Sequence, residues 1–557
     1  MSQHDLEAAR AAVADGARLL ATIGQRLGAA ICTGGKADTA RLHARGAEAF
    51  TFARLLAENE AARELCAYAR REQGAFEAGL ACLYAAESLQ NLSSALRFVE
   101  PRFGLAPADL APLDRHAAFV AQALSADVAT ALGDAVLDRD RDLGGSYGLD
   151  EDHRAIQATF ASFSDQRVRP VAEHVHRHDE IIPEDLLQAL AELGVFGISI
   201  PETYGGGFVD HLTMVLATEE LTRGSLGIGG GIITRPEICA KALLTGGTEE
   251  QKRKWFPLIA QGKRIVSVAV TEPNAGSDVA AVSTVAKKVP GGYVLSGEKT
   301  WCTFAGRADL FILLARTGDR SAGYKGLTLF LVEKPATIGS DGQYAFQHAQ
   351  PGGGTVEGRA IPTVGYRGMH SFAVSFSDYF VPEENRVGAE GQGFILQMQG
   401  FAGGRIQTAA RAVGLGEVAF REAVKYVKDR AIFGKKLADF PLTKRKLAQM
   451  AARLQAGRQL AYHVARLMDD GSSRDAASGG GGQLEASLVK LMTCRDAEWV
   501  TREAMQLHGG MGYSEEYSVS RYWQDARVLS IFEGAEEVLA ILVIARQSFE
   551  QHARTAG

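Results

Sequence analysis

The pattern of apolar and polar positions divides the chain into helical and β-rich parts. Helical spacing runs through residues 1 to about 135 and again from 152 to about 264, with apolar side chains recurring every three or four positions. Between residues 265 and 382 the pattern changes to short apolar or alternating runs, which is typical of strands. The strand candidates are residues 266–270, 293–295, 310–314 and 327–332. After Pro382, helical patterns return at residues 392–429, 441–470, 484–512 and 530–552, which is enough for a four-helix bundle.

These patterns predict an α+β protein with four domains, at residues 1–150, 151–264, 265–382 and 383–557. The first is a helical extension that ends in a linker, where Asp138 to Tyr147 carries five charges and then two glycines. A helical domain, a small β-barrel or sandwich, and a C-terminal four-helix bundle follow. The extension shows no titratable cluster, so we expect it to pack against the rest of the chain. The glycine run at 479–482 predicts a loop between two helices.

Composition narrows the classes of function. The 557 residues carry a formal net charge of −6, which provides no general attraction to nucleic acid or to an anionic membrane. No signal-peptide pattern opens the sequence and no apolar run of about eighteen residues occurs, so a cytoplasmic protein is the default expectation. The six cysteines are scattered without metal-ligand spacing. We therefore expect reduced cysteines and no metal site.

A carboxylate near the C-terminus is the first candidate for chemistry. Glu533 lies between Phe532 and Gly534, a short distance after the glycine-rich segment 506–513. Apolar flanks predict a poorly hydrated site, which suits a base that removes a weakly acidic C–H proton. Taken alone, the segment fits an exposed or helix-capping glutamate as well as a catalytic one.

Two further segments could bind a flat cofactor. Residues 268–278 begin as an apolar strand and open into a Pro/Gly turn whose amides and hydroxyls can bind phosphate oxygens or ring heteroatoms. Residues 296–303 form a strand that carries Trp301 and Thr303 two positions apart, and hence on one side of a sheet.

Together, and in this order, these segments resemble the acyl-CoA dehydrogenase family. The resemblance runs from about residue 152 to the C-terminus and includes the segments 193–198, 201–206 and 430–434. It implies the acyl-CoA dehydrogenase fold, noncovalently bound FAD, and oxidation of the Cα–Cβ bond of an acyl-CoA thioester. It also implies the cofactor contacts within one subunit, which are Val268, Thr271, Gly276, Ser277, Trp301 and Thr303, with Ser277 also near the pantetheine.

A second set of residues matches positions that serve the FAD of a neighbouring subunit, namely Arg430, Phe433, Gln506, Gly509 and Gly510. The resemblance therefore implies a homodimer or homotetramer. It also implies that electrons pass to an electron-transfer flavoprotein.

The resemblance assigns Glu533 as the catalytic base, and places Gly534 and Arg405 against the acyl-CoA. A surface salt bridge is the alternative for Arg405. Ala535 and the pair Phe440-Pro441 depart from the family's usual residues, so some of its contacts to the cofactor are missing here. The segment 402–404 is Ala-Gly-Gly and lacks the second carboxylate position that one branch of the family uses. Glu533 is therefore the only base that matches the family.

Arg235 suggests the substrate. By counting back from residues 247–251, it falls where the family closes the distal end of the acyl pocket. A buried guanidinium would disfavour a plain fatty chain and could pair with a substrate carboxylate, unless Glu237 or another acid neutralises it. We expect a short dicarboxylic acyl-CoA, best represented by (2S)-methylsuccinyl-CoA oxidised to mesaconyl-CoA, because a branch of the family acting on that thioester has a long helical extension. The alternatives are a short branched-chain acyl-CoA dehydrogenase, an acyl-CoA oxidase, and a non-catalytic flavoprotein scaffold.

Overall fold

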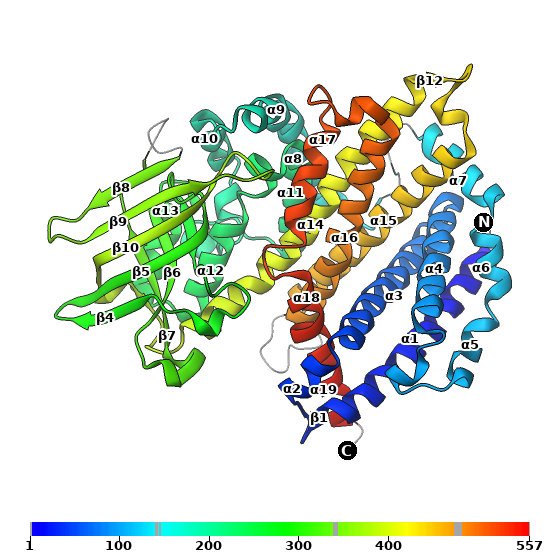
Figure 1. Cartoon of the computed structure of the whole chain (residues 1–557). Coiled ribbons are helices and arrows are strands. Elements are labelled where there is room, and N and C mark those ends of the chain that lie inside the picture. Colours follow the sequence, from blue (N-terminus) through cyan, green and yellow to red (C-terminus); the bar gives the residue numbers. More distant parts are fainter. Residues whose placement is uncertain (1–2, 140–142, 144–145, 338–343, 473–481, 556–557) are drawn as a thin grey trace. The chain divides into compact units, whose positions relative to one another are not determined.

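The computed structural model describes residues 3–139, 143, 146–337, 344–472 and 482–555. It contains two compact units, one of residues 1–156 with 408–557 and one of residues 157–407 (Figure 1). Half of the predicted linker at 138–147 and most of the predicted loop at 479–482 lie outside the described residues. The expected combination of helical regions with a central β region is confirmed.

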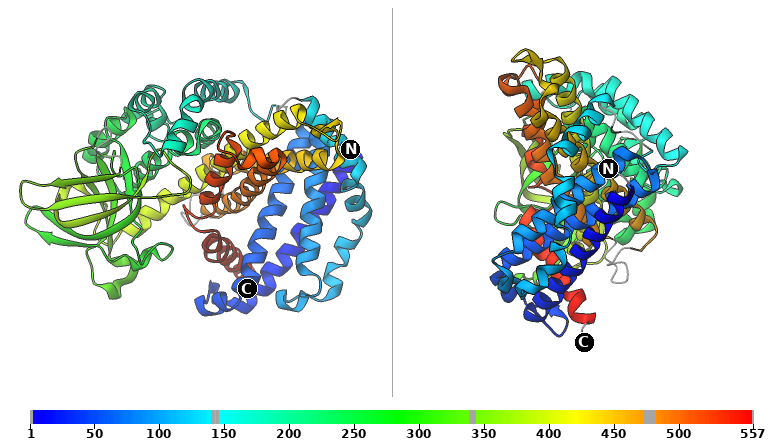
Figure 2. Two further views of the ribbon diagram at one scale, coloured as in Figure 1. Left: turned by 45° about the horizontal axis from the view of Figure 1, so that its top comes forward. Right: turned by 90° about the vertical axis from the view of Figure 1, so that its right-hand side faces the viewer.

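The first unit joins the N-terminal helices to the C-terminal ones. The long helices α1 (Gln3–Ile31), α3 (Gly46–Glu72) and α4 (Ala75–Leu96) pack on one another, and α3, α4 and α7 (Ala126–Asp138) pack on α15 (Pro441–Asp469) (Figures 1 and 2). The short elements between them are β1 (Cys32–Thr33), β2 (Lys36–Ala37), α2 (Thr39–Ala44), α5 (Ala111–Asp114) and α6 (Ala117–Ala123). The extension therefore packs against the C-terminal bundle, as expected.

The C-terminal helices agree with the predicted ranges except at the end. Helix α14 spans Gly393–Asp429 and α16 spans Gln483–His508, with the short strands β12 (Ala431–Ile432) and β13 (Lys435–Lys436) after α14. The continuous helix predicted at 530–552 is wrong, because Glu533 and Gly534 have left-handed φ values of 54° and 97° that no α-helix accommodates. Helix α17 (Val519–Leu529) ends before these residues, and α18 (Glu536–Val538), a π-helical segment (Leu539–Ala545) and α19 (Arg546–Thr555) follow them.

The second unit combines helices with one sheet. Its helical part contains α9 (Arg169–His178), α10 (Glu184–Glu192), α11 (His211–Gly224), α12 (Thr234–Gly246) and α13 (Glu249–Ala260), after α8 (Glu151–Phe163). Within the described residues, nine strands form the sheet in the order β11-β7-β6-β4-β5-β10-β9-β8, with β3 paired to β6. The strand bounds are β3 Val266–Ala269, β4 Val285–Val289, β5 Gly292–Thr303, β6 Leu310–Arg316, β7 Leu327–Glu333, β8 Ala345–Ala349, β9 Thr355–Ile361, β10 Ser371–Pro382 and β11 Arg386–Val387.

The burial of strand β6 explains why the sequence of this region is continuously apolar. Its alternate residues Leu310, Ile312 and Leu314 belong to a core with side chains of α12 and α13. The intervening residues, from Phe311 to Ala315, belong to a second core on the other side of the strand with side chains of β5 and β10. A strand buried on both faces needs apolar residues at every position, so the simple alternation of a half-exposed strand is lost.

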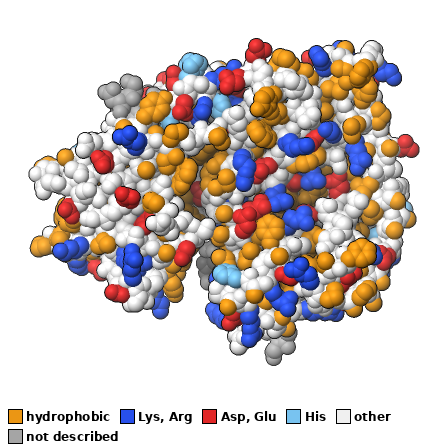
Figure 3. Space-filling view, in the orientation of Figure 1, with side chains coloured by type: hydrophobic (Ala, Val, Ile, Leu, Met, Phe, Trp, Pro, Cys, Tyr) orange, Lys and Arg blue, Asp and Glu red, His pale blue; other side chains and the backbone are white. Residues whose placement is uncertain are grey.

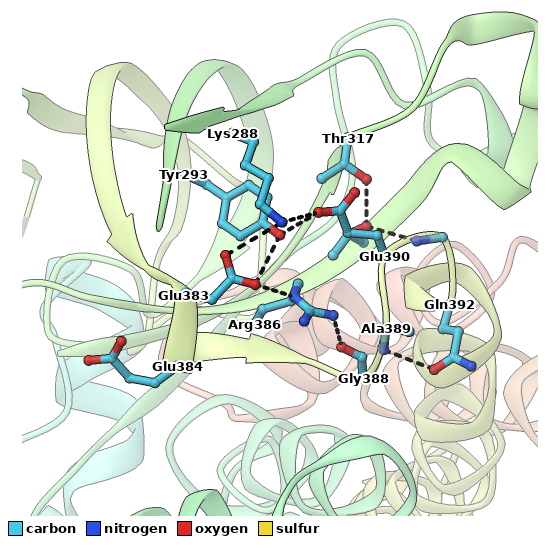
Figure 4. Close-up of polar contacts among 12 residues, drawn as sticks. Lys288, Tyr293, Thr317, Glu383, Glu384, Arg386, Gly388, Ala389, Glu390 and Gln392 are labelled. Atoms are coloured by element: carbon cyan, nitrogen blue, oxygen red, sulfur yellow. Dashed lines mark hydrogen bonds and ion pairs between the residues drawn. The ribbon is translucent and has the colours of Figure 1, made fainter. Parts of the chain in front are cut away.

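A polar network fixes the point where α14 begins (Figure 4). The Tyr293 hydroxyl donates to Glu390 at 2.6 Å, and Lys288 lies 3.2 Å from the same carboxylate. Arg386 lies 3.3 Å from Glu383, the other carboxylate that Lys288 approaches. The hydrogen bond from Tyr293, aided by Lys288, lowers the pKa of Glu390. The network ties the β4–β5 hairpin to the segment that leads from β10 into α14.

Five of the six cysteines are buried, and Cys32 is half-buried. Burial raises the pKa of Cys66, Cys82, Cys239 and Cys302 to about 12, and that of Cys494 to about 11. These thiols are therefore protonated near neutral pH.

The charged side chains of both signs are interspersed on the face drawn in Figure 3, in agreement with the small net charge. Over the described ranges, no single helix is long and apolar enough to cross a membrane, although the bent pair α6 and α7 meets the length and composition criteria together.

Candidate active site

The turn after β3 and the end of β5 are brought side by side. The amide of Thr300 donates to the carbonyl of Thr271 at 2.8 Å, so Thr271 lies next to the residue that precedes Trp301. The Ser267 hydroxyl donates to the carbonyl of Thr303 at 2.8 Å. The residues predicted to contact FAD within one subunit thus lie on β3, on the following turn and on β5.

An ion pair that sequence reasoning missed holds this turn. Lys299 is 1% exposed, and its ammonium donates to Glu272 at 2.8 Å and to the carbonyl of Val270 at 3.1 Å. Glu272 also accepts hydrogen bonds from the backbone and hydroxyl groups of Ser283 and Thr284. Burial opposes ionisation of Glu272, but Lys299 and these hydrogen bonds outweigh it and lower the pKa to about 2. The spacing of acid and base in the sequence gave no signal for this pair, because it joins the turn after β3 to β5, 27 residues further along the chain.

Trp301 presents an aromatic surface beside Thr271. Its side chain is 55% exposed, although it stands in a sheet whose other large side chains are mostly buried. Its φ of 58° is unusual for a residue with a side chain and marks an irregular position within the strand. Two residues on, the Thr303 hydroxyl lies 3.1 Å from the hydroxyl of Ser371 on β10. An exposed ring and a hydroxyl therefore lie at the same end of β5.

These residues fit an isoalloxazine ring with a pyrophosphate tail. The exposed indole can cover a flat ring, while the hydroxyls of Thr271 and Thr303 can meet its heteroatoms. Gly276 and Ser277 are exposed in the turn, where amides and a hydroxyl can meet phosphate oxygens. Val268 is half-buried on β3, opposite Ile312 of β6. When bound, FAD would supply the acceptor for a hydride, which is two electrons and a proton.

Arg235 lies in the first turn of α12 and is 7% exposed. Its guanidinium donates to the carbonyl of Gly231 and, at 3.0 Å, to the hydroxyl of Tyr366. Within the described ranges it has no carboxylate partner, so the alternative of an ion pair with Glu237 is not observed. Residues two apart on a helix point in different directions, which explains why the two side chains diverge.

Glu237 instead faces α14. It is fully buried, and the side-chain amide of Gln407 donates to it. A Cβ atom at Gly403 would lie 1.9 Å from its Oε1, so only glycine leaves room for this carboxylate. Arg405, two residues further along α14, is 7% exposed and is therefore a buried side chain rather than a surface one. The absence of a side chain at 403 makes space for a buried acid from α12.

Glu533 lies in a loop between α17 and α18 and is half-buried in the isolated chain. Its left-handed backbone costs on the order of 1–3 kcal/mol, and such strain persists only where neighbouring contacts hold it. The carbonyl of Gly534 accepts a hydrogen bond from Lys490 at 2.7 Å. The preceding ring, Phe532, lies under the guanidinium of Arg411, 4.7 Å from its centroid. The conformation of the candidate base is therefore fixed by the helices beneath it.

The positions predicted to serve a neighbouring subunit form one corner of the first unit. Tyr426, near the end of α14, stacks on His508 at the end of α16, with ring centroids 4.2 Å apart. This stack brings Arg430 and the segment 506–510 into the same region. Arg430, Gln506, Gly509 and Gly510 are exposed, and Phe433 is 92% exposed. An exposed phenylalanine beside glycines is consistent with a surface that another molecule covers.

The part of the chain that the structure describes contains no group of three or more His, Cys, Asp or Glu side chains placed to hold a metal ion.

Comparison with known proteins identifies the family. Three family models match in succession: the acyl-CoA dehydrogenase N-terminal domain at residues 150–263, the middle domain at 267–379 and the C-terminal domain at 391–549. The chain therefore belongs to the acyl-CoA dehydrogenase family. It is an FAD-dependent oxidoreductase that acts on an acyl-CoA, so the expected fold, cofactor and class of enzyme are confirmed.

Three relatives illustrate the range of the family. The chain is 43% identical over 404 residues to (2S)-methylsuccinyl-CoA dehydrogenase of Cereibacter sphaeroides, which is 72% of this chain and 70% of that protein. It is 33% identical to the caffeyl-CoA reductase-Etf complex subunit CarC of Acetobacterium woodii, over 71% of this chain and 97% of that protein. The structure of butyryl-CoA dehydrogenase from Megasphaera elsdenii matches with a TM-score of 0.64 and 32% identity, over 72% of this chain and 98% of that one.

Proposed function

We propose that this enzyme oxidises the Cα–Cβ bond of a short dicarboxylic acyl-CoA, with (2S)-methylsuccinyl-CoA going to mesaconyl-CoA as the best candidate. The observation that carries the proposal is Arg235, a buried guanidinium whose partners among the described residues are uncharged. A buried charge without a counter-ion is costly, whereas a substrate carboxylate would pair with it bidentately. The relative at 43% identity is named for a dicarboxylic thioester, which supports the same choice.

In the proposed reaction Glu533 removes the α-proton. FAD, held by the residues of β3, the following turn and β5, would supply the acceptor for the β-hydride. The thioester oxygen gains negative charge as the proton departs. By family analogy, the backbone N–H of Glu533 donates to that oxygen, and the loss of one such donor typically raises a barrier by about 3 kcal/mol. Arg405 and Gly534 would contact the CoA side of the thioester. We further propose that electrons pass to an electron-transfer flavoprotein, as the name of the Acetobacterium relative suggests for that protein. A cytoplasmic location stays a prediction.

The role of Glu533 is tested with Glu533→Gln, which keeps the shape of the side chain but cannot accept the proton. Reduction of bound FAD by methylsuccinyl-CoA, followed anaerobically at the flavin absorbance band, should slow by about 100-fold or more. FAD content and thioester binding should be retained. A variant that reduces FAD at nearly the wild-type rate would show that another group is the base.

The substrate is tested with Arg235→Met. Loss of a buried charge pair costs roughly 2 kcal/mol or more, so kcat/KM for methylsuccinyl-CoA should fall by at least about 30-fold relative to 2-methylbutanoyl-CoA. Arg223→Met is the matched control, because Arg223 is a buried arginine that already pairs with Glu220. The control should leave the ratio of the two substrates unchanged. A wild-type preference for butanoyl-CoA or octanoyl-CoA over dicarboxylic thioesters would disprove the substrate assignment.

A further inference from the structure

The loop that carries Glu533 has an unusual set of anchors. This base loop, defined as residues 530–536, is folded on itself by a hydrogen bond from the amide of Glu536 to the carbonyl of Ser530 at 3.1 Å. Both Glu533 and Gly534 have left-handed φ values within it. A strained loop of this kind keeps its shape only if contacts from outside define it.

Helix α16 (Gln483–His508) supplies several of those contacts. Lys490, Arg495 and Glu498 each contact a different part of the base loop. Glu498 accepts a hydrogen bond from the hydroxyl of Ser530, and Arg495 donates to Glu536 at 2.5 Å. Lys490 is 1% exposed, and its ammonium donates to the carbonyl of Gly534 at 2.7 Å. The peptide group next to the candidate base is therefore bound by a buried cation.

A second buried cation reaches the loop from α14. Arg411 is 1% exposed, and its guanidinium lies over the Phe532 ring. Its hydrogen bond goes to the hydroxyl of Thr408, and its Nε has no partner. Among the described residues no carboxylate pairs with it. The cation–π contact with the Phe532 ring is therefore the contact through which Arg411 holds the base loop.

We propose that Lys490 and Arg411 are positioning residues, which hold Glu533 and its backbone N–H in the orientation that proton removal requires. Lys490 fixes the peptide after Glu533, and Arg411 fixes the ring before it. Because the groups on both sides of Glu533 are held, its backbone has little freedom to change conformation. Neither cation is assigned any contact with the substrate. The inference rests on the proposed function, in which Glu533 is the base.

The test compares Lys490→Met with Glu533→Gln and the wild type, each with bound FAD. A misplacement of about 1 Å can slow a reaction by on the order of 100-fold, so anaerobic FAD reduction in Lys490→Met should slow to that extent. The dissociation constant of the product mesaconyl-CoA, read from its perturbation of the flavin absorbance, should stay near the wild-type value. Arg411→Met should show the same separation of rate from binding. Lys490→Arg, which keeps a donor, should recover part of the rate.

Arg458→Met is the control for general damage, because Arg458 is a buried cation of the same unit that pairs with Glu417 at 3.1 Å. It should lower the thermal midpoint without slowing FAD reduction in the folded protein. Wild-type reduction rates in folded Lys490→Met and Arg411→Met would overturn the inference, and so would a loss of thioester affinity at an unchanged rate. If Lys490→Met does not retain FAD, Lys490→Arg decides by the same two measurements. Normal reduction by Glu533→Gln would instead show that the proposed function is wrong.

Discussion

Lys299 and Arg235 are both buried cations, but they differ in whether a carboxylate of the chain lies beside them. Lys299 has the carboxylate of Glu272 beside it and serves the structure of a turn, whereas Arg235 donates to uncharged groups among the described residues, which is why we propose that it meets a ligand. Position along the chain was enough to single out Arg235. It could not show whether Glu237 neutralises it, because that depends on the space that Gly403 leaves on another helix. The sequence was thus enough to name a candidate site residue, but not to name its partners.

The Glu272–Lys299 pair should make the fold sensitive to acid. The pKa of Glu272 is about 2 in the folded chain, below the ordinary value of 4.5. Its stabilisation is therefore complete above about pH 4.5 and is lost as the pH falls toward 2. Glu272→Gln leaves the ammonium without its counter-ion, so it should lower the free energy of unfolding at pH 7 by roughly 3–5 kcal/mol and reduce the slope of stability between pH 4.5 and 3.

Denaturant unfolding at several pH values measures both effects. Glu249→Gln is the control, since Glu249 is an exposed carboxylate that pairs with Lys252 and should matter little to stability. A Glu272→Gln protein with the wild-type acid response would show that the pair does not govern it.

Whole elements were predictable where one periodicity dominates. Helix α14 was expected at 392–429 and occurs at 393–429, because apolar positions recur along its entire length. The failure at 530–552 has a local cause, since residues 531, 532 and 535 are apolar and match a helical pattern that Glu533 and Gly534 do not follow. Left-handed backbone at a glutamate carries no sequence signal. It is set by anchors on α14 and α16, which are distant in the sequence.

Helix α14 also contains a position where helix propensity and packing make opposite predictions. A Gly→Ala change inside a helix usually stabilises it by about 1 kcal/mol. At Gly403 the new methyl group would collide with the fully buried Glu237, so Gly403→Ala should instead destabilise by roughly 1–3 kcal/mol. Gly46→Ala at the start of α3, where a Cβ meets only an ordinary contact at 3.6 Å, should be neutral or slightly stabilising. Thermal unfolding of the two variants checks the difference in sign, and a stabilised Gly403→Ala would contradict the packing.

The whole molecule presents a surface that the isolated chain leaves uncovered. Arg430, Phe433 and the segment 506–510 gather at the joined ends of α14 and α16, and the resemblance assigns them to the FAD of another subunit. We therefore propose an oligomer with FAD bound across the interface. The packing of the extension on α15 is equally a property of the whole fold. The sequence predicted that the extension would pack against the body but could not name α15 as its partner, because amphipathic helices do not specify which apolar face they meet.

Arg430→Ala should weaken FAD retention and assembly together, because it removes a charge-assisted contact to phosphate. Light scattering and the ratio of flavin to protein absorbance measure the two properties on one sample. Arg502→Ala is the control, because Arg502 is an exposed arginine of α16 that pairs with Glu503 within its own helix. A monomeric Arg430→Ala protein that keeps its full complement of FAD would refute the shared site.

The buried cysteines are natural chemical probes of local unfolding. A thiol reagent reacts with thiolates, and five of the six cysteines are enclosed and protonated in the folded chain. Cys239 and Cys302 belong to one compact unit, while Cys66, Cys82 and Cys494 belong to the other. The rates at which a mild alkylating agent modifies the two groups therefore report local unfolding of each unit separately, without any engineered probe.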